Sequence, residues 1–412
     1  MTSSLTWLDY SERDRRRALD VIDLFRETST VDELGLATVR NSFSNLFFPG
    51  TSTVQTRACY FLLVPWTFLR LERLRTSSNK VEARARRAEL NLSRRMLGGD
   101  DTLGVFGSQA GDALKRLPSE VYWGGLGSWG ICTFSAHKWA YFRSLDGFYR
   151  RGDRFRSTLC DPEGRSAPPA NWHPHVPDPP LGFPYENVSA VLRRQDAEYL
   201  QDRIQARHPD SLLAVLAGRA NPVDLQAHRP WHLSQLNQLT PALREQLRNA
   251  ELFAVYMQGA VLLYNLMLSE LREHGEWTEE YRRRLEDWAA EVDALRPAAG
   301  DWRPDGVWRV VRASGRSLGY PTRLFVERWV EDLGRGGPRA VVADNSTART
   351  LVKDREVQLK RARARLTNSR RLELWGGDSG TGRMAYRWGA AKRILTDIFD
   401  GLTRGEGDAR HA

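Results

Sequence analysis

Apolar residues recur every three or four positions over long stretches of the chain, which is the spacing of one face of an α-helix. Residues 31–47 show this spacing, and Thr30 with Glu33 has the form of a capping box. Pro49 and Gly50 then break the pattern. A first helix is therefore expected to end at about residue 47.

A second helix is expected directly after this break. Ser52 and Gln55 again have capping-box spacing, so the helix should begin near Thr53 and run to about Arg75, with a kink at Pro65. Its middle is apolar on nearly all sides, which predicts a central position in its domain.

The strongest helical pattern covers residues 240–274. Thr240 suits the N-cap, Pro241 suits the first helical position, and Gly275 stands where a C-terminal cap belongs. A further helix over residues 278–295 follows after a tight turn, which predicts an antiparallel helix pair.

The predicted fold class is mainly α, multi-helical, with two or three domains and a small β-hairpin near the C-terminus, within residues 370–388. A chain of 412 residues exceeds what a single core usually holds. Eight prolines between Asp161 and Pro184 predict a connection between domains or an extended arm. The expected organisation is a helical N-terminal domain (1–160), a Pro-rich connection (161–186), a helical domain with the long helix pair (187–300), a basic C-terminal region (301–402) and a disordered tail (403–412).

The composition is that of a soluble globular protein, with 41% hydrophobic and 27% charged residues. Three widely separated cysteines and the lack of a signal-peptide pattern favour a reducing, cytoplasmic setting. The two longest apolar runs, 59–69 and 252–268, are shorter than the roughly 20 residues that a membrane span needs. We therefore expect no membrane association.

Positive charge is concentrated in two segments of a chain whose net charge is +10. Residues 70–95 contain nine Arg or Lys and three Glu, and residues 353–393 contain twelve Arg or Lys and four acidic residues. Segregated charge is typical of a polyanion-binding surface, but a solvated helix face in an Arg-rich protein has the same pattern. Both interpretations stay open at this point.

The loop before the second helix, Gly50, Thr51, Ser52 and Thr53, is a possible anion site. Free amides and hydroxyls at a helix start bind anions, and Arg57 lies one turn further on. The loop lacks the Gly-x-x-x-x-Gly-Lys spacing of a P-loop, and the capping box accounts for the same residues as structural groups. We favour the structural interpretation.

Residues 107–131 have the rhythm of a helix-turn-helix, with Pro118 and Ser119 at the junction. Three glycines between residues 124 and 127 are unfavourable in a recognition helix. Plain packing of the neighbouring tryptophans is the alternative.

No catalytic constellation is evident from the residues. His173 and His175 lie in a proline-rich loop and form a weak metal signal without a tetrahedral ligand set. Nucleophile elbows, kinase motifs and the His-x-Lys motif of phospholipase-D nucleases are not found. The sequence therefore indicates no catalytic residue, no metal and no cofactor, and an enzyme is the less expected class.

The closing segment interleaves arginines with Trp375, Tyr386 and Trp388, a composition suited to stacking on bases and pairing with phosphates. Its alternative is an exposed hairpin whose aromatic residues pack against the last helix. The candidate nucleic-acid-binding residues of both basic segments are Arg57, Arg84, Arg87, Arg370, Arg371, Arg383, Arg387, Lys392 and Arg393.

Four segments carry a family resemblance: "LTWLDYSERDRRRALDVIDLF", "DELGLATVRNSFSNLFFPGTSTVQTRACYFLLVPW", "LPSEVYWGGLGSWGI" and "RLELWGGDSGTGRMAYRW". They resemble a bacterial family of uncharacterised proteins over nearly the whole chain, and the Phe-Pro-Gly-Thr-Ser block is the most specific part. Cys59 departs from the pattern, since an Arg is more usual after Gln-Thr-Arg-Ala. The resemblance implies genes found beside helicases and phospholipase-D-like nucleases in phage-defence clusters, with no established catalytic residues.

The expected function is that of a non-enzymatic accessory subunit of a bacterial anti-phage defence system. The subunit would bind DNA or another nucleic acid through its basic segments and dock a helicase or phospholipase-D-like nuclease. A divergent nuclease or nucleotide-processing enzyme and a purely structural protein scaffold are the two alternatives.

Overall fold

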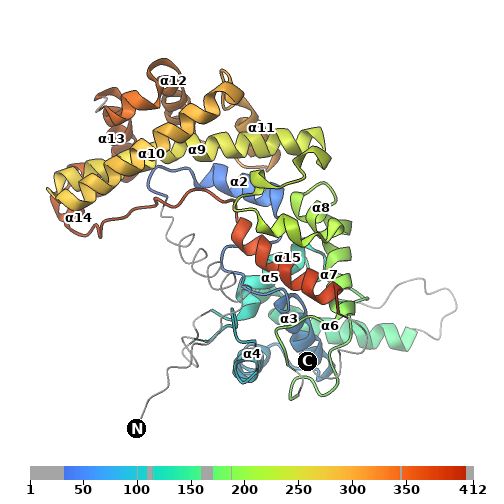
Figure 1. Cartoon of the computed structure of the whole chain (residues 1–412). Coiled ribbons are helices and arrows are strands. Elements are labelled where there is room, and N and C mark those ends of the chain that lie inside the picture. Colours follow the sequence, from blue (N-terminus) through green and yellow to red (C-terminus); the bar gives the residue numbers. More distant parts are fainter. Residues whose placement is uncertain are drawn as a thin grey trace, which may run out of the picture. The chain divides into compact units, whose positions relative to one another are not determined.

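The computed structural model describes residues 32–404, apart from 100, 109–113, 115, 159–169, 187 and 344–345. The mainly helical class is confirmed, because the described residues form α-helices joined by loops and short 3-10 helices (Figure 1). Thr30 and most of the predicted tail lie outside the described residues. The helices are α2 (Ala37–Phe47), α3 (Tyr60–Arg73), α4 (Val81–Leu97), α5 (Pro118–Ser128), α6 (Lys138–Thr158), α7 (Arg194–Arg207), α8 (Leu212–Arg219), α9 (Pro241–Leu271), α10 (Gly275–Ala299), α11 (Asp305–Ala313), α12 (Tyr320–Val342), α13 (Ser346–Lys360), α14 (Ser369–Glu373) and α15 (Trp388–Leu402).

The chain folds into two compact units, each assembled from two distant segments. The α9 unit combines residues up to 47 with residues 227–388, and the α3 unit combines residues 48–226 with those from 389 onward. The domains predicted from the sequence instead follow one another along the chain. Long-range pairing of the first and last helices accounts for this difference: α2 packs on α11 in one unit, and Gly401 of α15 lies against Ala197 of α7 in the other.

Helix α9 is the core of its unit, and 21 of its 31 residues are buried. Thr240 accepts a hydrogen bond from the Leu243 amide at 3.2 Å, as its predicted N-cap role requires. The helix is long and apolar enough to cross a membrane, but 94% of its most apolar window is buried inside the structure. It is therefore a buried core helix, in line with the expectation that it does not span a membrane.

The predicted antiparallel pair is formed by α9 and α10, which lie side by side (Figure 1). The Trp288 ring approaches Gly259 so closely that a Cβ there would lie 2.2 Å from it, and its Nε1 donates to the Val255 carbonyl at 2.8 Å. The position predicted for the C-terminal cap is wrong. Helix α9 ends at Leu271, Glu273 takes the left-handed turn at φ 54°, and Gly275 begins α10.

The predicted β-hairpin does not form, and residues 370–388 contain α14, a loop and the start of α15. Side chains of α9 supply the hydrogen bonds that a partner strand would otherwise give. The Asn265 amide donates to the Ser379 carbonyl at 3.0 Å and accepts from the Ser379 amide at 2.9 Å, while Gln258 donates to the Thr381 carbonyl at 2.8 Å. With its polar backbone satisfied in this way, the glycine-rich loop needs no strand pairing.

In the α3 unit, α3 is central as predicted, since ten of its 14 residues are buried. Its predicted start near Thr53 is wrong, because the helix begins at Tyr60. The Thr56 and Arg57 amides donate to the Tyr122 hydroxyl at 2.9 and 3.0 Å, which gives them partners outside a helix. Residues 51–58 therefore form turns between Phe48 and α3.

The described part of residues 107–131 contains one helix, α5, rather than a visible helix pair. Gly125 of α5 lies against the loop before α3, where a Cβ would be 2.4 Å from the Gly50 carbonyl oxygen. Trp129, which follows α5, stacks on Phe61 at a centroid distance of 3.8 Å. Gly125 thus allows close packing in the core, as in the packing alternative, whereas a Cβ at Gly124 or Gly127 would meet no neighbour.

The proline-rich residues 170–183, here called the arm, lie across α3 inside one unit. The Thr133 amide donates to the Asn171 carbonyl at 2.9 Å, and the His173 amide donates to the Ile131 carbonyl at 2.8 Å. The Trp66 indole donates to the Pro177 carbonyl at 2.6 Å. The extended-arm interpretation therefore describes this segment.

A buried arginine holds the α3 unit together. The Arg57 guanidinium donates from Nε to both oxygens of Asp397 at 3.1 Å, from Nη2 to Asp101 at 2.9 Å, and from Nη1 to the Leu103 carbonyl at 2.9 Å. Burial raises the pKa of the Asp397 carboxyl, and Arg57 together with the Ala58 amide counters this rise. The network joins the loop before α3 to α15 across 340 positions of sequence.

We predict that Arg57→Ala destabilises the fold by about 3–5 kcal/mol, because it leaves the Asp397 carboxylate buried without its partner. Arg75→Ala is the matched control, since it breaks the Arg75–Asp153 pair, whose two side chains are each 50% exposed. That loss should be much smaller than the loss for Arg57→Ala, because solvent screens an exposed ion pair. Urea unfolding measures both, and equal losses would contradict the central role of Arg57.

Glu89 lies on the buried face of α4 and anchors this helix to α5. Its two oxygens accept from the Ser119 amide and from the Ser119 hydroxyl, both at 2.8 Å. Burial raises the pKa of the Glu89 carboxyl to about 7, against the smaller opposing effect of these hydrogen bonds and of Lys138. Ionisation of this side chain therefore opposes folding.

Because the pKa of Glu89 is higher in the folded than in the unfolded chain, its contribution to stability is present below about pH 4.5 and is lost as the pH rises through 7. We predict that Glu89→Gln gains about 3 kcal/mol relative to the wild type between pH 4.5 and pH 8. Urea unfolding of both proteins at several pH values measures this gain. A stability difference that does not change with pH would refute it.

Candidate nucleic-acid interface

The outward face of α4 carries a stripe of positive charge. Val81, Ala85, Leu92 and Met96 are buried on the opposite face. The basic residues on the outward face, here called the α4 stripe, are Lys80, Arg84, Arg87, Arg94 and Arg95, and all five are exposed. Steps of three, four and seven residues keep them on one side of a helix, over a length of about 22 Å.

Neutral side chains accept hydrogen bonds from two arginines of the α4 stripe. Arg84 donates to the Thr76 hydroxyl at 3.4 Å, and Arg94 donates to the Asn91 side chain at 3.0 Å. Within the described part of the chain, no carboxylate lies at ion-pair distance from Arg84, Arg87 or Arg95. Their charge is therefore available to an anionic partner.

An exposed tyrosine stands beside the C-terminal end of the α4 stripe. Tyr185 is 62% exposed, and the guanidinium carbons of Arg70 and Arg95 lie 5.4 and 5.3 Å from its ring centroid. Arg70 also donates to the Tyr185 hydroxyl at 2.9 Å, and Arg95 donates to its carbonyl at 2.6 Å. Both guanidiniums lie over the ring in cation–π contact, so an unpaired base would stack on Tyr185 by displacing one of them.

Several polar groups of the possible anion loop are hydrogen-bonded inside the fold, whereas the Ser52 hydroxyl is buried with no hydrogen-bond partner among the described residues. Thr51 donates from its hydroxyl to the Phe48 carbonyl at 2.7 Å, and the Ser52 amide donates to the Gln55 side chain at 3.0 Å. Gly50 has φ 78°, and a Cβ there would lie 2.3 Å from the Trp129 indole nitrogen. The Arg57 side chain is paired with Asp397 and Asp101. The loop, which also includes Thr53, therefore acts as a structural turn.

Much of the C-terminal basic segment is paired inside the α9 unit. Arg383 binds both oxygens of Glu291 at 2.5 Å, Arg387 donates to Asn45 at 2.8 Å, and Arg365 donates to Glu33 at 2.7 Å. Lys360 also pairs with Glu33, and burial together with Arg365 lowers the pKa of this lysine to about 8. Local charge along the sequence thus overestimates the charge that this segment exposes.

The remaining candidate nucleic-acid-binding residues differ in how far their side chains are exposed. Arg370 and Arg371 are exposed on α14, whereas Arg393 is partly buried and donates to the Gln55 carbonyl at 3.1 Å. Lys392 is half-buried next to it. Because α4 and α14 belong to different units, we treat them as separate surfaces.

The aromatic residues of the closing segment are unavailable for stacking on bases. Trp375, Tyr386 and Trp388 are at most 2% exposed. Tyr386 donates to the Ala250 carbonyl and Trp388 donates to the Ala227 carbonyl, at 2.8 and 2.9 Å. These rings belong to the core of the α9 unit, and Trp375 packs against Trp277 and Tyr281 of α10, so the alternative of an exposed hairpin against the last helix does not describe them.

The histidines of the arm have neighbours other than a metal ligand set. His173 lies 3.0 Å from an Arg203 nitrogen and 3.3 Å from the Tyr199 hydroxyl, and burial together with Arg203 lowers its pKa. His175 lies beside it. No group of three His, Cys, Asp or Glu residues suitable for a metal occurs in the described ranges.

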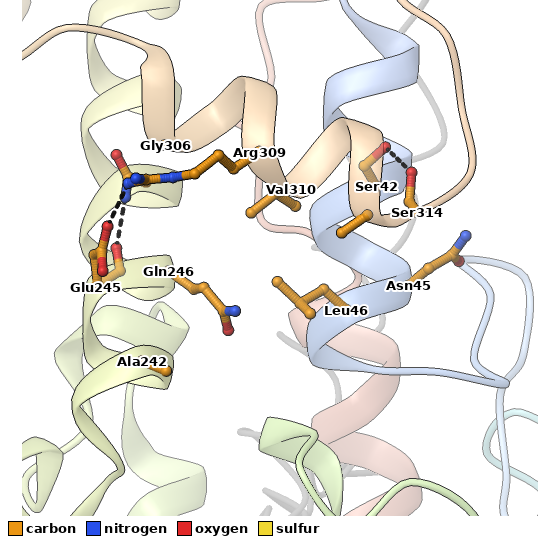
Figure 2. A pocket seen from close by; sticks show the side chains of 12 residues that line it. Ser42, Asn45, Leu46, Ala242, Glu245, Gln246, Gly306, Arg309, Val310 and Ser314 are labelled. Carbon is orange, nitrogen blue, oxygen red and sulfur yellow. Dashed lines mark hydrogen bonds and ion pairs between the residues drawn. The ribbon is translucent and has the colours of Figure 1, made fainter.

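A groove of about 470 Å³ lies between α2, α9 and α11 in the α9 unit (Figure 2). Arg309 is its arginine, and this side chain pairs with Glu245 at 2.8 Å. Ser42 and Ser314 contact each other at 2.9 Å, and the other lining residues are neutral. The one arginine that lines this groove is therefore paired with an acid, unlike Arg84, Arg87 and Arg95 among the described residues.

The sequence identified Arg84 and Arg87 but missed Arg94, Arg95 and Tyr185. Helical spacing extends the α4 stripe to residues 94 and 95, so these two arginines were within reach of the pattern. No local sequence pattern marks Tyr185, because it reaches α4 only through the path of the arm that precedes it in the chain.

A family model described as a family of unknown function, DUF6361, matches residues 2–401. The comparisons with curated proteins and with solved structures give no match. The chain belongs to the family of unknown function DUF6361.

Proposed function

We propose that this protein binds nucleic acid through the α4 stripe. In this proposal it is an accessory subunit of a bacterial anti-phage defence system and docks a helicase or phospholipase-D-like nuclease in the cytoplasm. The observation that supports nucleic-acid binding is a helix face with five exposed cations, where no carboxylate of the described residues pairs with Arg84, Arg87 or Arg95. The defence role and the partner rest on the family resemblance alone.

The geometry of the α4 stripe suits a phosphate backbone. Phosphates follow one another every 3.4 Å or so along one strand of B-form DNA, so a stripe of about 22 Å faces roughly six of them. Lys80, Arg84 and Arg87 follow one another by about one helical turn, and Arg94 comes two turns after Arg87, so each can reach a different phosphate. Such contacts carry no base information, so the binding is expected to be independent of sequence.

Tyr185 adds a preference for unpaired strands. Bases in a duplex stack on each other and leave no face for an aromatic side chain, whereas bases of a single strand or a frayed end offer both faces. The ring lies next to Arg70 and Arg95, so phosphates on either side of a stacked base would meet a cation. We therefore expect single-stranded DNA or RNA to bind more tightly than a blunt duplex.

We predict that Arg84→Glu with Arg87→Glu weakens binding to a labelled single strand by about tenfold or more at low salt. The slope of log affinity against log salt should fall by about 1.4, since two phosphate contacts to a single strand are lost. Fluorescence anisotropy across a salt series measures both quantities.

Arg312→Glu with Arg316→Glu is the matched control, because these exposed arginines give the same change of net charge on another surface. It should alter affinity only slightly. Arg370→Glu with Arg371→Glu tests the α14 surface in the same assay. An unchanged affinity in the α4 double variant would overturn the proposal, and a loss confined to the α14 variant would transfer the binding surface to the α9 unit.

A further inference from the structure

A cavity of about 550 Å³ lies in the α3 unit between α3, α6 and the arm. Its volume is within the range of 300–1,000 Å³ or so that small-molecule sites occupy. Trp66, Phe148, Trp172 and Phe183 form its apolar walls. The cavity contains both acidic and basic side chains, which distinguishes it from a gap left by imperfect packing.

Glu72 presents a partly unused carboxylate to this cavity. Three donors converge on its Oε1: the Tyr141 hydroxyl at 2.6 Å, the Asn171 amide at 3.0 Å and the Trp172 indole at 3.1 Å. Oε2 has no hydrogen-bond partner among the described residues. The side chain is therefore held rigidly from three directions while one oxygen remains to accept from a ligand.

Burial raises the pKa of the Glu72 carboxyl, although its three donors act in the opposite direction. Because Glu72 is only half-buried, Oε2 is open to the cavity and can exchange a water molecule for a ligand donor. A ligand with an N–H or NH₂ group would supply that donor.

Two arginines line the same cavity one helical turn apart. Arg70 and Arg73 project from α3, and Arg73 is exposed with no ion-pair or hydrogen-bond partner among the described residues. Arg70 also contacts Tyr185, so the cavity adjoins the end of the α4 stripe. Asp178 is the second acid of the lining and lies exposed on the arm.

These groups select for a ligand with two chemical features. A simple anion would pair with the arginines but leave the Glu72 oxygen without a donor. A simple cation would suit Glu72 but would be repelled by Arg70 and Arg73. A planar body with N–H donors at one end and a negative charge at the other satisfies all three residues and the apolar walls.

We propose that this cavity binds a nucleotide, with the donor edge of the base on Glu72 and the phosphate on Arg73 and Arg70. The inference rests on the proposed function in one respect, since the nucleotide can be the terminal residue of a strand bound along the α4 stripe. A free mononucleotide has the same chemistry. The two sources are separated by experiment.

The test uses the full chain with AMP, GMP, CMP and UMP by calorimetry, and with single strands that carry or lack a 5′-phosphate by anisotropy. Arg73→Glu should weaken mononucleotide binding by roughly tenfold or more, as the loss of a charge-assisted contact to phosphate predicts. Arg143→Glu, an exposed change of equal charge on α6, should leave binding unaltered. Glu72→Gln should weaken binding as well, with thermal unfolding measured to verify that the variant folds.

The outcomes distinguish the source of the nucleotide. If Arg73→Glu removes the preference for 5′-phosphorylated strands, a strand end is the ligand. If it weakens mononucleotides alone, a free nucleotide is the ligand.

Failure of this inference differs from failure of the proposed function. The α4 double variant, Arg84→Glu with Arg87→Glu, should lose strand binding and keep mononucleotide binding. If none of the four mononucleotides binds at about 5 mM, and Arg73→Glu leaves strand binding unchanged, the nucleotide site is overturned while binding along the α4 stripe stands.

Discussion

The α3 unit depends on the buried pair of Arg57 and Asp397. A charged guanidinium costs several kcal/mol to remove from water and is tolerated only where carboxylates and carbonyls surround it. Arg57 obtains these acceptors from Asp397, Asp101, Leu103 and Ala190, which are far apart along the chain. Because Asp397 of α15 is one of these acceptors, α15 packs against the loop before α3, and the unit therefore consists of two chain segments.

The arginines of this protein have two different roles, which depend on whether the side chain is paired with an acid inside the fold. Arg57, Arg365 and Arg383 meet buried or half-buried acids and hold elements together. The arginines of the α4 stripe project from a helix whose one buried acid, Glu89, faces the opposite way toward Ser119. The same residue type thus stabilises the core in one place and offers a binding surface in another. Arg70 and Arg73 of the proposed nucleotide cavity project from α3, the buried central helix of its unit, so this helix contributes both to the core and to the proposed binding site.

The helices could largely be predicted from the sequence, because periodicity and caps act within a few residues. Thr240 is a cap in the structure as in the prediction, and the α9 and α10 pair follows from it. The hairpin over residues 370–388 was wrong because Asn265 and Gln258, more than a hundred residues earlier, satisfy its backbone. Two of the five residues of the α4 stripe were predicted, whereas Tyr185 and Glu72 were not, since their roles depend on the path of the arm.

The sequence by itself determined that the protein is helical, that α9 is a core helix and that positive charge gathers in two segments. These properties follow from local spacing and composition, which every short stretch of chain carries with it. Only the tertiary structure decided which arginines are paired, which aromatic rings are buried, and which acceptor is left open at Glu72. Those outcomes depend on partners that lie tens to hundreds of residues away, and folding alone brings such partners within hydrogen-bond distance.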